Sequence, residues 1–398
     1  MRTVQRIATG MLALGLLAAA WPAAAAMLSV RDYATPQAAI AAAHDGDRIY
    51  FPAGVYVIPD SGLVVDKQLE LFGDGIGRGD YGTRLRPRSE HGDGNVIVIG
   101  APGAQPPGYV TIRDLRIECP APGTASAGQG CGIQLVLSPA ARAAVERLLI
   151  ERVVVSGMAG DGIEIVGGTQ GAGAVILSSL TDVQVVGCHG NGLVLKGGSV
   201  INVERGYFNG NRLAGIFATA VASLRLDQVA LENNQNRPAV DDPSYDPQLR
   251  LKLCHGFNVL GCYFENFAGA APHARTTAAV LEGCRGGVFQ GCYFTQPSYV
   301  AASRGVLATG GSSTIMFGAS SYDQVGTTIQ LEDSPQAQSH IVFPQCAVRA
   351  VPGDTTAYAL RVGQRAGDSV LLLPGAAGRD PTPRYYDGTR WRVVAPGR

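Results

Sequence analysis

The feature that most constrains this chain is a short segment that recurs, in which glycine is followed by alternating apolar residues. Gly132, Gly162 and Gly192 follow one another at equal intervals, and Gly215 continues the series after a shorter interval. Repetition at this period, in strand-like rather than helical units, indicates a solenoid. The four segments are residues 131–136, 161–166, 191–196 and 214–219.

Cysteines repeat with the same period. Four of them form two pairs with the same interval as the glycines: Cys254 with Cys284, and Cys262 with Cys292. Equivalent strands of successive coils lie about 4.8 Å apart. That spacing admits either disulfides or a ladder of buried thiols, and we favour the ladder because cysteine behaves as a small apolar residue in interiors. Cys119 and Cys131, which flank a loop, are the better disulfide candidates.

Apolar residues alternate within each repeat. Ile133 and Leu135, like Ile163 and Ile165, fall on one face of a strand, while most residues between them are polar. The long amphipathic helices of helical repeat proteins are absent from the sequence. A strand that turns and pairs in parallel with the same strand one coil later predicts an all-β chain, a single-stranded parallel β-helix.

The N-terminal region carries a more specific pattern. Thr35 and Pro36 read as the N-cap and first residue of a short helix. Three segments follow it, at residues 47–56, 69–75 and 83–85: Asp-Arg-Ile-Tyr-Phe-Pro-Ala-Gly-Val-Tyr, Leu-Glu-Leu-Phe-Gly-Asp-Gly and Thr-Arg-Leu. Together they resemble the opening of the pectate lyase superfamily. The resemblance covers about residues 28–310 and implies a right-handed parallel β-helix whose open end is capped by the helix.

That resemblance is specific for fold and weak for activity, because the superfamily includes lyases, hydrolases, epimerases and non-catalytic adhesins. It gives the domain organisation. Residues 27–335 are expected to form the β-helix, with the N-terminal cap at about 28–60. Residues 336–398 are expected to hold the last rungs and a small C-terminal β cap.

The segment 1–26 has the features of a signal peptide. Arg2 and Arg6 form a positive region, residues 11–20 are apolar, and the alanines at 24–26 offer a small-residue cleavage site. The mature protein is therefore expected to be periplasmic or secreted, with no membrane association after cleavage. With 32 basic and 32 acidic side chains, the chain has no basic field that would suggest a nucleic-acid partner.

Outward positions of the glycine-led strands are where chemistry is expected. The Cys254–Cys284 match sets the register of the later coils and places Lys252 one rung from Glu282, close enough for an ion pair. An outward charged residue on a solenoid is more often a solvated surface residue than a catalytic one. The predicted row contains Gln134, Glu164, Val194, Phe217, Lys252, Glu282 and Ala308.

Two kinds of reaction guide the choice of residues. A glycosidase needs one protonated and one ionised carboxyl. A lyase acting on a uronic acid needs a cation for the sugar carboxylate and a base of the lysine, arginine, histidine or tyrosine type, for which Lys252, Arg250, His189 and Tyr245 are candidates. The catalytic candidates are Glu164, Lys252, Glu282, Asp161, His189 and Asp242. The substrate-binding candidates are Gln134, Lys196, Phe217, Tyr245 and Arg250.

Motifs leave the reaction open. Residues 187–190, Gly-Cys-His-Gly, with Lys196 beyond them, are similar to elements of polygalacturonases, but the acidic elements that precede them in that family are missing. Asp241, Asp242 and Asp246 could supply oxygen ligands to calcium, although such clusters are more often solvated loops. No metal site and no certain cofactor are predicted, and the oligomeric state is left open.

The sequence therefore predicts an exported polysaccharide-active β-helix protein. Cleavage of an acidic polysaccharide by β-elimination or hydrolysis is the leading activity. The alternatives are a non-catalytic glycan-binding or structural β-helix and a uronan C5-epimerase, so the enzymatic assignment stays open between a lyase and a glycoside hydrolase.

Overall fold

The computed structural model describes residues 25–77, 81–100, 105–121, 129–137, 144–167, 174–234, 247–265, 277–332, 341–342, 370–373, 382–386 and 391–393. The helices among them are η1 (Val30–Asp32) and α1 (Pro36–Ala42), and the other elements are strands. The predicted signal peptide lies outside these residues except for its last two. No helix of the described part is long and apolar enough to cross a membrane.

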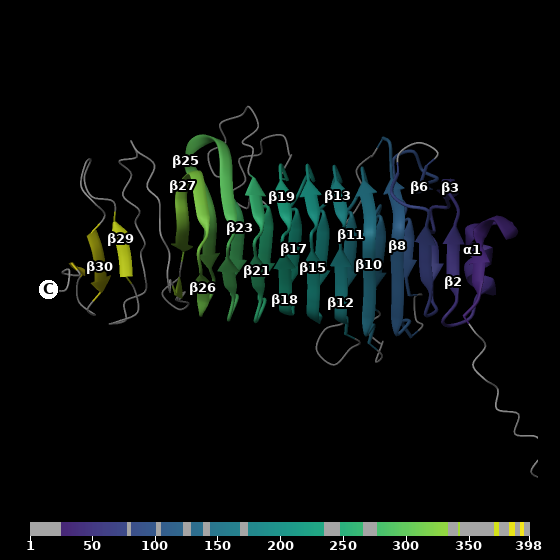
Figure 1. Ribbon diagram of the computed structural model, residues 1–398, viewed down its shortest axis with the longest axis horizontal. Helices are drawn as coiled ribbons and strands as arrows, with labels where there is room; N and C mark the ends of the chain where they lie inside the picture. The colour runs from purple at the N-terminus through teal and green to yellow at the C-terminus, as the bar shows by residue number, and fades with distance from the viewer. Residues whose placement is uncertain are drawn as a thin grey trace, which may run out of the picture.

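The strands form three parallel stacks that wind into the predicted right-handed β-helix, drawn in Figure 1 as a row of coils. Stack A holds the glycine-led strands. Its members are β4 (Leu63–Val65), β7 (Ile97–Ile99), β9 (Ile133–Val136), β11 (Ile163–Val166), β14 (Leu193–Lys196), β17 (Ile216–Thr219), β20 (Leu249–Lys252) and β23 (Thr277–Glu282).

Stack B follows stack A along each coil. Its members are β1 (Met27–Ser29), β2 (Arg48–Phe51), β5 (Glu70–Gly73), β12 (Ile176–Thr181), β15 (Ser199–Glu204), β18 (Ala222–Asp227), β21 (Asn258–Leu260), β24 (Val288–Gln290), β26 (Ile315–Phe317) and β28 (Ile341–Val342). Stack C completes the coil. Its members are β3 (Gly54–Ile58), β6 (Thr83–Pro87), β13 (Gln184–Val186), β16 (Tyr207–Asn209), β19 (Ala230–Glu232) and β22 (Tyr263–Glu265).

Four long strands belong to two stacks each. β8 (Tyr109–Glu118) and β10 (Arg147–Ser156) run from stack B into stack C. β25 (Tyr293–Thr309) and β27 (Ser321–Glu332) run from stack C into stack A. The chain therefore keeps one strand order through the described coils.

In the coils from β8 to β24, a single left-handed residue turns the chain from stack B to stack C. Asp114, Arg152 and Asp182 occupy this corner with φ of 56°, 49° and 53°. Arg205 and Gln228 continue it. Left-handed backbone is costly for residues other than glycine, and asparagine and aspartate tolerate it best. Opposite charges on consecutive coils compensate part of that cost, since Arg152 Nε donates to Asp114 Oδ1 at 2.6 Å and Arg205 Nε to Asp182 Oδ1 at 2.8 Å.

The repeated glycines are required by close packing. A Cβ atom on Gly162 would lie 2.1 Å from Val185 Cγ1 and 2.7 Å from the carbonyl oxygen of Gly192. A Cβ atom on Gly132 would meet Val155 Cγ1 at 2.4 Å in the same way. Any side chain here would push stack A away from stack C, which explains the period that the sequence shows.

Apolar side chains and thiols fill the interior. Ile163, Ile165 and their equivalents are fully buried, and Phe264 stacks on Phe294 with ring centroids 4.5 Å apart. The four repeated cysteines are buried free thiols, so the predicted ladder is what the structure contains. Cys284 Sγ donates to the carbonyl of the preceding coil at Leu251, at 3.3 Å.

The expected bridge between Cys119 and Cys131 is wrong, since both are free thiols with different partners. Cys119 Sγ lies 3.3 Å from the carbonyl oxygen of Glu90, whereas Cys131 lies beside Glu164. The loop between the two cysteines suggested a closure that the coil geometry does not make, because each side chain is directed to a different neighbouring segment.

The predicted short N-terminal helix is confirmed, with Thr35 as its N-cap. Thr35 Oγ1 accepts from the amide of Ala38 at 3.1 Å, and Pro36 is the first residue of α1. Lys67 donates to three carbonyls at the other end of this helix, including that of Ala43 at 2.7 Å. This cation satisfies carbonyls that a helix end leaves without partners.

The described C-terminal strands are separate from the β-helix. β29 (Val370–Leu373), β30 (Thr382–Tyr386) and β31 (Trp391–Val393) form a small antiparallel sheet, which Figure 1 shows beyond the last coils. That this sheet caps the β-helix stays a prediction. The last rung expected at residues 358–362 lies outside the described residues.

Candidate functional site

The predicted outward row splits into two columns of stack A. Pairing places Phe217 opposite Arg250, and Thr219 opposite Lys252. Lys252 and Glu282 are opposite one another, as predicted. They do not continue the row of Phe217, however, because each lies two positions further along its strand than the residue that does. The long segment between the paired residues Ile216 and Leu249 hid this shift of two.

The observed strand register defines the two columns. The first contains Gln134, Glu164, Val194, Phe217, Arg250 and Val280. The second contains Val136, Val166, Lys196, Thr219, Lys252 and Glu282. Glu164 and Glu282 are four coils apart, or about 19 Å at the usual strand spacing. The six catalytic candidates therefore cannot act on one bond.

Glu282 belongs to an ion-pair network between β20 and β23 of stack A. Its Oε1 lies 2.6 Å from Arg250 Nη2, and its Oε2 lies 3.7 Å from Lys252 Nζ. The Arg250 guanidinium also lies 5.9 Å from the centre of the Phe217 ring. Both cations are thus engaged with a carboxylate on a partly exposed face, which is the arrangement of a structural network rather than of a proton-transfer site.

Glu164 is held differently, beneath the surface. It is 4% exposed although it points away from the apolar interior. Gln134 Nε2 donates to its Oε2 at 3.0 Å, and Lys196 Nζ donates to its Oε1 at 3.0 Å. Asn95 Nδ2 in turn donates to Gln134 Oε1 at 2.7 Å. The predicted residues Gln134, Glu164 and Lys196 are therefore brought together, but Glu164 is covered where a solvated residue was expected.

Asp161 lies beside this chain of hydrogen bonds, two positions before the first residue of β11. Its Oδ1 accepts from the amide of Asn191 at 2.6 Å and from Asn191 Nδ2 at 2.9 Å. Burial raises the pKa of Asp161, and the charge of Glu164 adds to the increase. The two hydrogen bonds from Asn191 and the charge of Lys196 oppose it. Asp161 is thus a partly exposed carboxyl that holds its proton more tightly than usual.

The column of Asp161 explains why a polar residue stands there. Asn95 Oδ1 accepts from the amide of Cys131 at 2.9 Å, and Asn191 Oδ1 accepts from the amide of Ala214 at 3.1 Å. Each of these side chains bonds the equivalent amide one coil later. Asp161 makes the same bond with a carboxylate in place of an amide group. It therefore adds a titratable group to a ladder of hydrogen bonds that run from a side chain to the backbone amide of the next coil.

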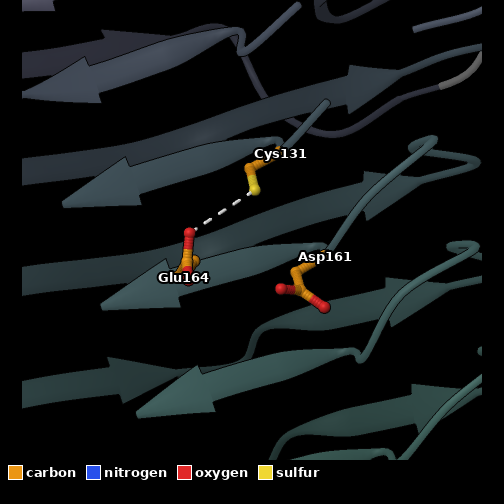
Figure 2. Close-up of side chains that lie close together, drawn as sticks. All are labelled: Cys131, Asp161 and Glu164. Atoms are coloured by element: carbon orange, nitrogen blue, oxygen red, sulfur yellow. Dashed lines mark hydrogen bonds between the residues drawn. The ribbon is translucent and has the colours of Figure 1, made fainter. Parts of the chain in front are cut away.

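Figure 2 shows Cys131, Asp161 and Glu164 converging from two consecutive coils. One ligand atom of each lies within 4.8 Å of the others, the only such metal-compatible group among the described residues. Burial raises the pKa of the Cys131 thiol, and the Lys196 ammonium already supplies positive charge to Glu164. A protonated thiol and an occupied carboxylate suit proton transfer better than cation binding.

The remaining predicted residues are accounted for as follows. His189 is half-buried, its amide donates to the carbonyl of Met158 at 2.8 Å, and its Nδ1 is buried without a partner. Asp242 and Tyr245 lie outside the described residues, as do the calcium candidates Asp241 and Asp246. Their roles stay predictions.

Asn95 and Cys131 belong to the site but are not among the predicted site residues. A signal existed for both, because Asn95 precedes β7 by the same two positions as Cys131 precedes β9. The interval from Asn95 to Cys131 is longer than the interval from Cys131 to Asp161, which concealed the equivalence.

Comparison with known proteins adds information on the fold. No family model matches the chain, and no curated protein matches it. Among solved structures, the mannuronan C-5 epimerase AlgE6 A-module of Azotobacter vinelandii is 16% identical, with 81% of this chain and 97% of that chain covered and a TM-score of 0.43. The likeness is one of fold.

Two other solved structures are also similar in fold. The enzymatically active domain of bacteriophage CBA120 tailspike protein 2 is 12% identical, covering 79% of this chain and 44% of that chain, with a TM-score of 0.43. Pectate lyase Pel9A is 13% identical, covering 80% and 72%, with a TM-score of 0.32.

Proposed function

We propose that this chain is an exported enzyme that cleaves an acidic polysaccharide by β-elimination at the Asp161 site of stack A. The observation that supports it is that a carboxyl group and an ammonium group, both accessible to solvent, lie near one another at this site. Asp161 is a partly exposed carboxyl of raised pKa. Lys196 is an ammonium whose side chain is 42% exposed. Elimination from a uronic acid needs a base and a cation, and these two groups can serve in those roles.

Each group has a defined task in this proposal. Lys196 uses one N–H to hold Glu164, and its other two have no partner within the described part of the chain, so they can contact a sugar carboxylate. The Asp161 carboxylate takes the proton from C5 of that sugar. The electron pair forms the C4–C5 double bond, the bond from C4 to the glycosidic oxygen breaks, and water protonates the leaving oxygen.

Glu164 acts on Asp161 rather than on the sugar. Both of its oxygens are occupied and it is almost covered, so its negative charge works at short range to strengthen Asp161 as a base. A base of raised pKa transfers protons more effectively near neutral pH than an ordinary aspartate does. Glu164 is therefore a positioning residue in this scheme.

Hydrolysis is the second candidate, and one distance favours it. The nearest oxygens of Asp161 and Glu164 lie within 4.8 Å, close to the separation of about 5–5.5 Å between the two carboxyl groups of retaining glycosidases. The cover over Glu164 argues against its attack on a sugar, which is why elimination ranks first.

The test incubates the full chain with polygalacturonate, alginate and hyaluronan, and follows unsaturated products by absorbance and new reducing ends by titration. Elimination gives both signals, and hydrolysis gives reducing ends alone. Neither signal, with an altered proton NMR spectrum of the polymer, would show C5-epimerisation, which shares the proton abstraction. Neither signal and an unaltered polymer would leave a non-catalytic glycan-binding or structural protein.

Asp161→Asn is the decisive variant. Asparagine occupies the same column at Asn95 and Asn191 and makes the same bond, so the ladder is expected to survive. Activity should fall at least about a hundredfold, since general base catalysis contributes roughly that much or more. Asp182→Asn is the matched control on a corner of another face and should keep full activity. Equal activity of Asp161→Asn and the parent would refute the proposal.

A further inference from the structure

Stack C carries a second set of chemistry-bearing side chains that the proposed site does not use. We call it the tyrosine–carboxylate strip. It runs along five consecutive coils and contains Tyr207, Glu232, Tyr263, Glu265, Tyr293 and Asp323.

The strip faces away from the interior. Phe208, Leu231 and Phe264, which alternate with its members along the strands, are fully buried. Because neighbouring residues of a strand point to opposite faces, the strip residues point outward. Tyr293 is 39% exposed, and the other members are partly exposed.

Each tyrosine is fixed by a carboxylate or by a neighbouring ring. Tyr207 Oη donates to Glu232 Oε2 at 3.0 Å across one coil. Tyr263 Oη donates to Glu265 Oε2 at 2.8 Å within its own coil. The rings of Tyr263 and Tyr293 are neighbours, with centroids 5.7 Å apart. The strip is therefore a preorganised row of aromatic rings, which binds a ligand with less loss of side-chain entropy than free rotors would.

The carboxylates keep acceptors that the protein leaves open. Glu232, Glu265 and Asp323 accept through one oxygen each, and the other oxygen has no partner in the described coils. No lysine or arginine pairs with these three groups within the same residues. Stack A differs, because Lys196, Arg250 and Lys252 there are all paired with glutamates.

From this arrangement we propose that the tyrosine–carboxylate strip is a second glycan-binding site, which holds an extended chain of neutral or amino sugars along the axis of the β-helix. Sugar rings present apolar C–H faces to aromatic rings and hydroxyl donors to carboxylate oxygens. Coils spaced by about 4.8 Å place a contact roughly once per sugar ring.

Charge selects the class of ligand. A polyuronate would bring carboxylates against Glu232 and Glu265, which lack a cation among the described residues to offset the repulsion. A neutral chain avoids this cost, and an amino sugar gains an ion pair. The strip would therefore bind a different part of a mixed polysaccharide, or a different polymer, from the acidic substrate proposed for stack A.

Binding is tested on the full chain by isothermal titration with cellohexaose, chitosan hexamer and hexagalacturonate. Binding of either of the first two should weaken about two- to tenfold for each of Tyr263→Ala and Tyr293→Ala. Tyr109→Ala is the control, since Tyr109 is a 42% exposed tyrosine on β8 in stack B. It should bind as the parent does.

Two further measurements separate this site from the proposed catalytic one. Asp161→Asn should bind cellohexaose and chitosan hexamer as the parent does, because the strip does not depend on Asp161. The double variant Glu232→Gln/Glu265→Gln should gain affinity for hexagalacturonate while its thermal unfolding stays close to that of the parent. The proposal is overturned if neither cellohexaose nor chitosan hexamer binds the parent, or if their affinity survives Tyr263→Ala and Tyr293→Ala unchanged.

Discussion

Lys196 Nζ donates to Glu164 Oε1 at 3.0 Å, so the ammonium of one coil closes over the carboxylate of the coil before it. The two residues stand in different columns, since Lys196 is opposite Val166 and Glu164 is opposite Val194. The diagonal contact leaves Glu164 covered and Lys196 half-exposed. It is the contact by which a buried charge is tolerated on stack A.

Replacing Lys196 by an apolar side chain of similar length should expose the cost of that buried charge. Lys196→Met leaves Glu164 without its cation and should lower the free energy of unfolding by about 2 kcal/mol, below the range for fully buried pairs because the lysine is partly solvated. Urea unfolding measures the loss. The double variant Glu164→Gln/Lys196→Met should recover most of it, and a double variant as unstable as Lys196→Met would show that the charge is not the cause.

Asp161 should make stability depend on pH in the direction opposite to most aspartates. Its pKa is raised above 3.8 in the folded chain, mainly by burial. Its stabilising contribution is therefore fully present below the unfolded-state pKa and is lost as the pH rises through the folded-state pKa. Asp161→Asn should be more stable than the parent at about pH 7, and the difference should vanish toward about pH 3. Urea unfolding at several pH values measures it; a gain that grew on acidification would contradict the assignment.

Gly162 and Gly187 separate two reasons for glycine in a β-helix. Gly162→Ala forces a Cβ onto Val185 and the Gly192 carbonyl, and should cost about 3 kcal/mol of unfolding free energy. Gly187 has φ of +66°, and a Cβ placed on it would meet nothing within 4 Å, so Gly187→Ala should cost only about 1 kcal/mol of backbone strain. Thermal and urea unfolding of both variants compare the two. Equal losses would mean that packing at Gly162 relaxes more than its contacts suggest.

The fold followed from short-range regularities in the sequence. The spacing of Gly132, Gly162 and Gly192 reports a steric requirement that acts within each coil, and the cysteine match gave the correct pairing of Lys252 with Glu282. Register across the long insertion did not follow. Nothing local fixes how many residues a loop takes up, so the predicted row pairs Phe217 with Lys252, whereas the structure pairs it with Arg250.

The site was harder to predict than the fold, because burial and pKa depend on neighbours from other coils. Glu164 is buried in contact with Gln134 and Lys196, which belong to the coils on either side of it. The contact with Lys196 is diagonal, so a row of equivalent positions does not reveal it. The strip on stack C did leave a signal. Tyr263 and Tyr293 follow the repeated Cys262 and Cys292 directly, and the shared interval could have placed them on adjacent coils.

The corner between stacks B and C offers a test of charge at left-handed residues. Arg152 and then Arg113 hold the pKa of Asp114 below its usual value of 3.8. The stability that Asp114 contributes is therefore present above the unfolded-state pKa and lost as the pH falls through the folded-state pKa. Asp114→Asn keeps a residue that tolerates φ of 56°, so it removes the charge without adding backbone strain.

We expect Asp114→Asn to lower the free energy of unfolding by about 1 kcal/mol at neutral pH, at the upper end for partly exposed pairs. The parent and the variant should become equally stable in acid, where Asp114 is protonated, and urea unfolding across this range measures both. Gln228→Asn is the matched control, because Gln228 occupies the same corner with φ of 54° and is not part of an ion pair among the described residues. Its effect should stay within about 0.5 kcal/mol and should not change with pH. A loss at Asp114 that persists unchanged in acid would show that the corner depends on side-chain shape rather than on alternating charge.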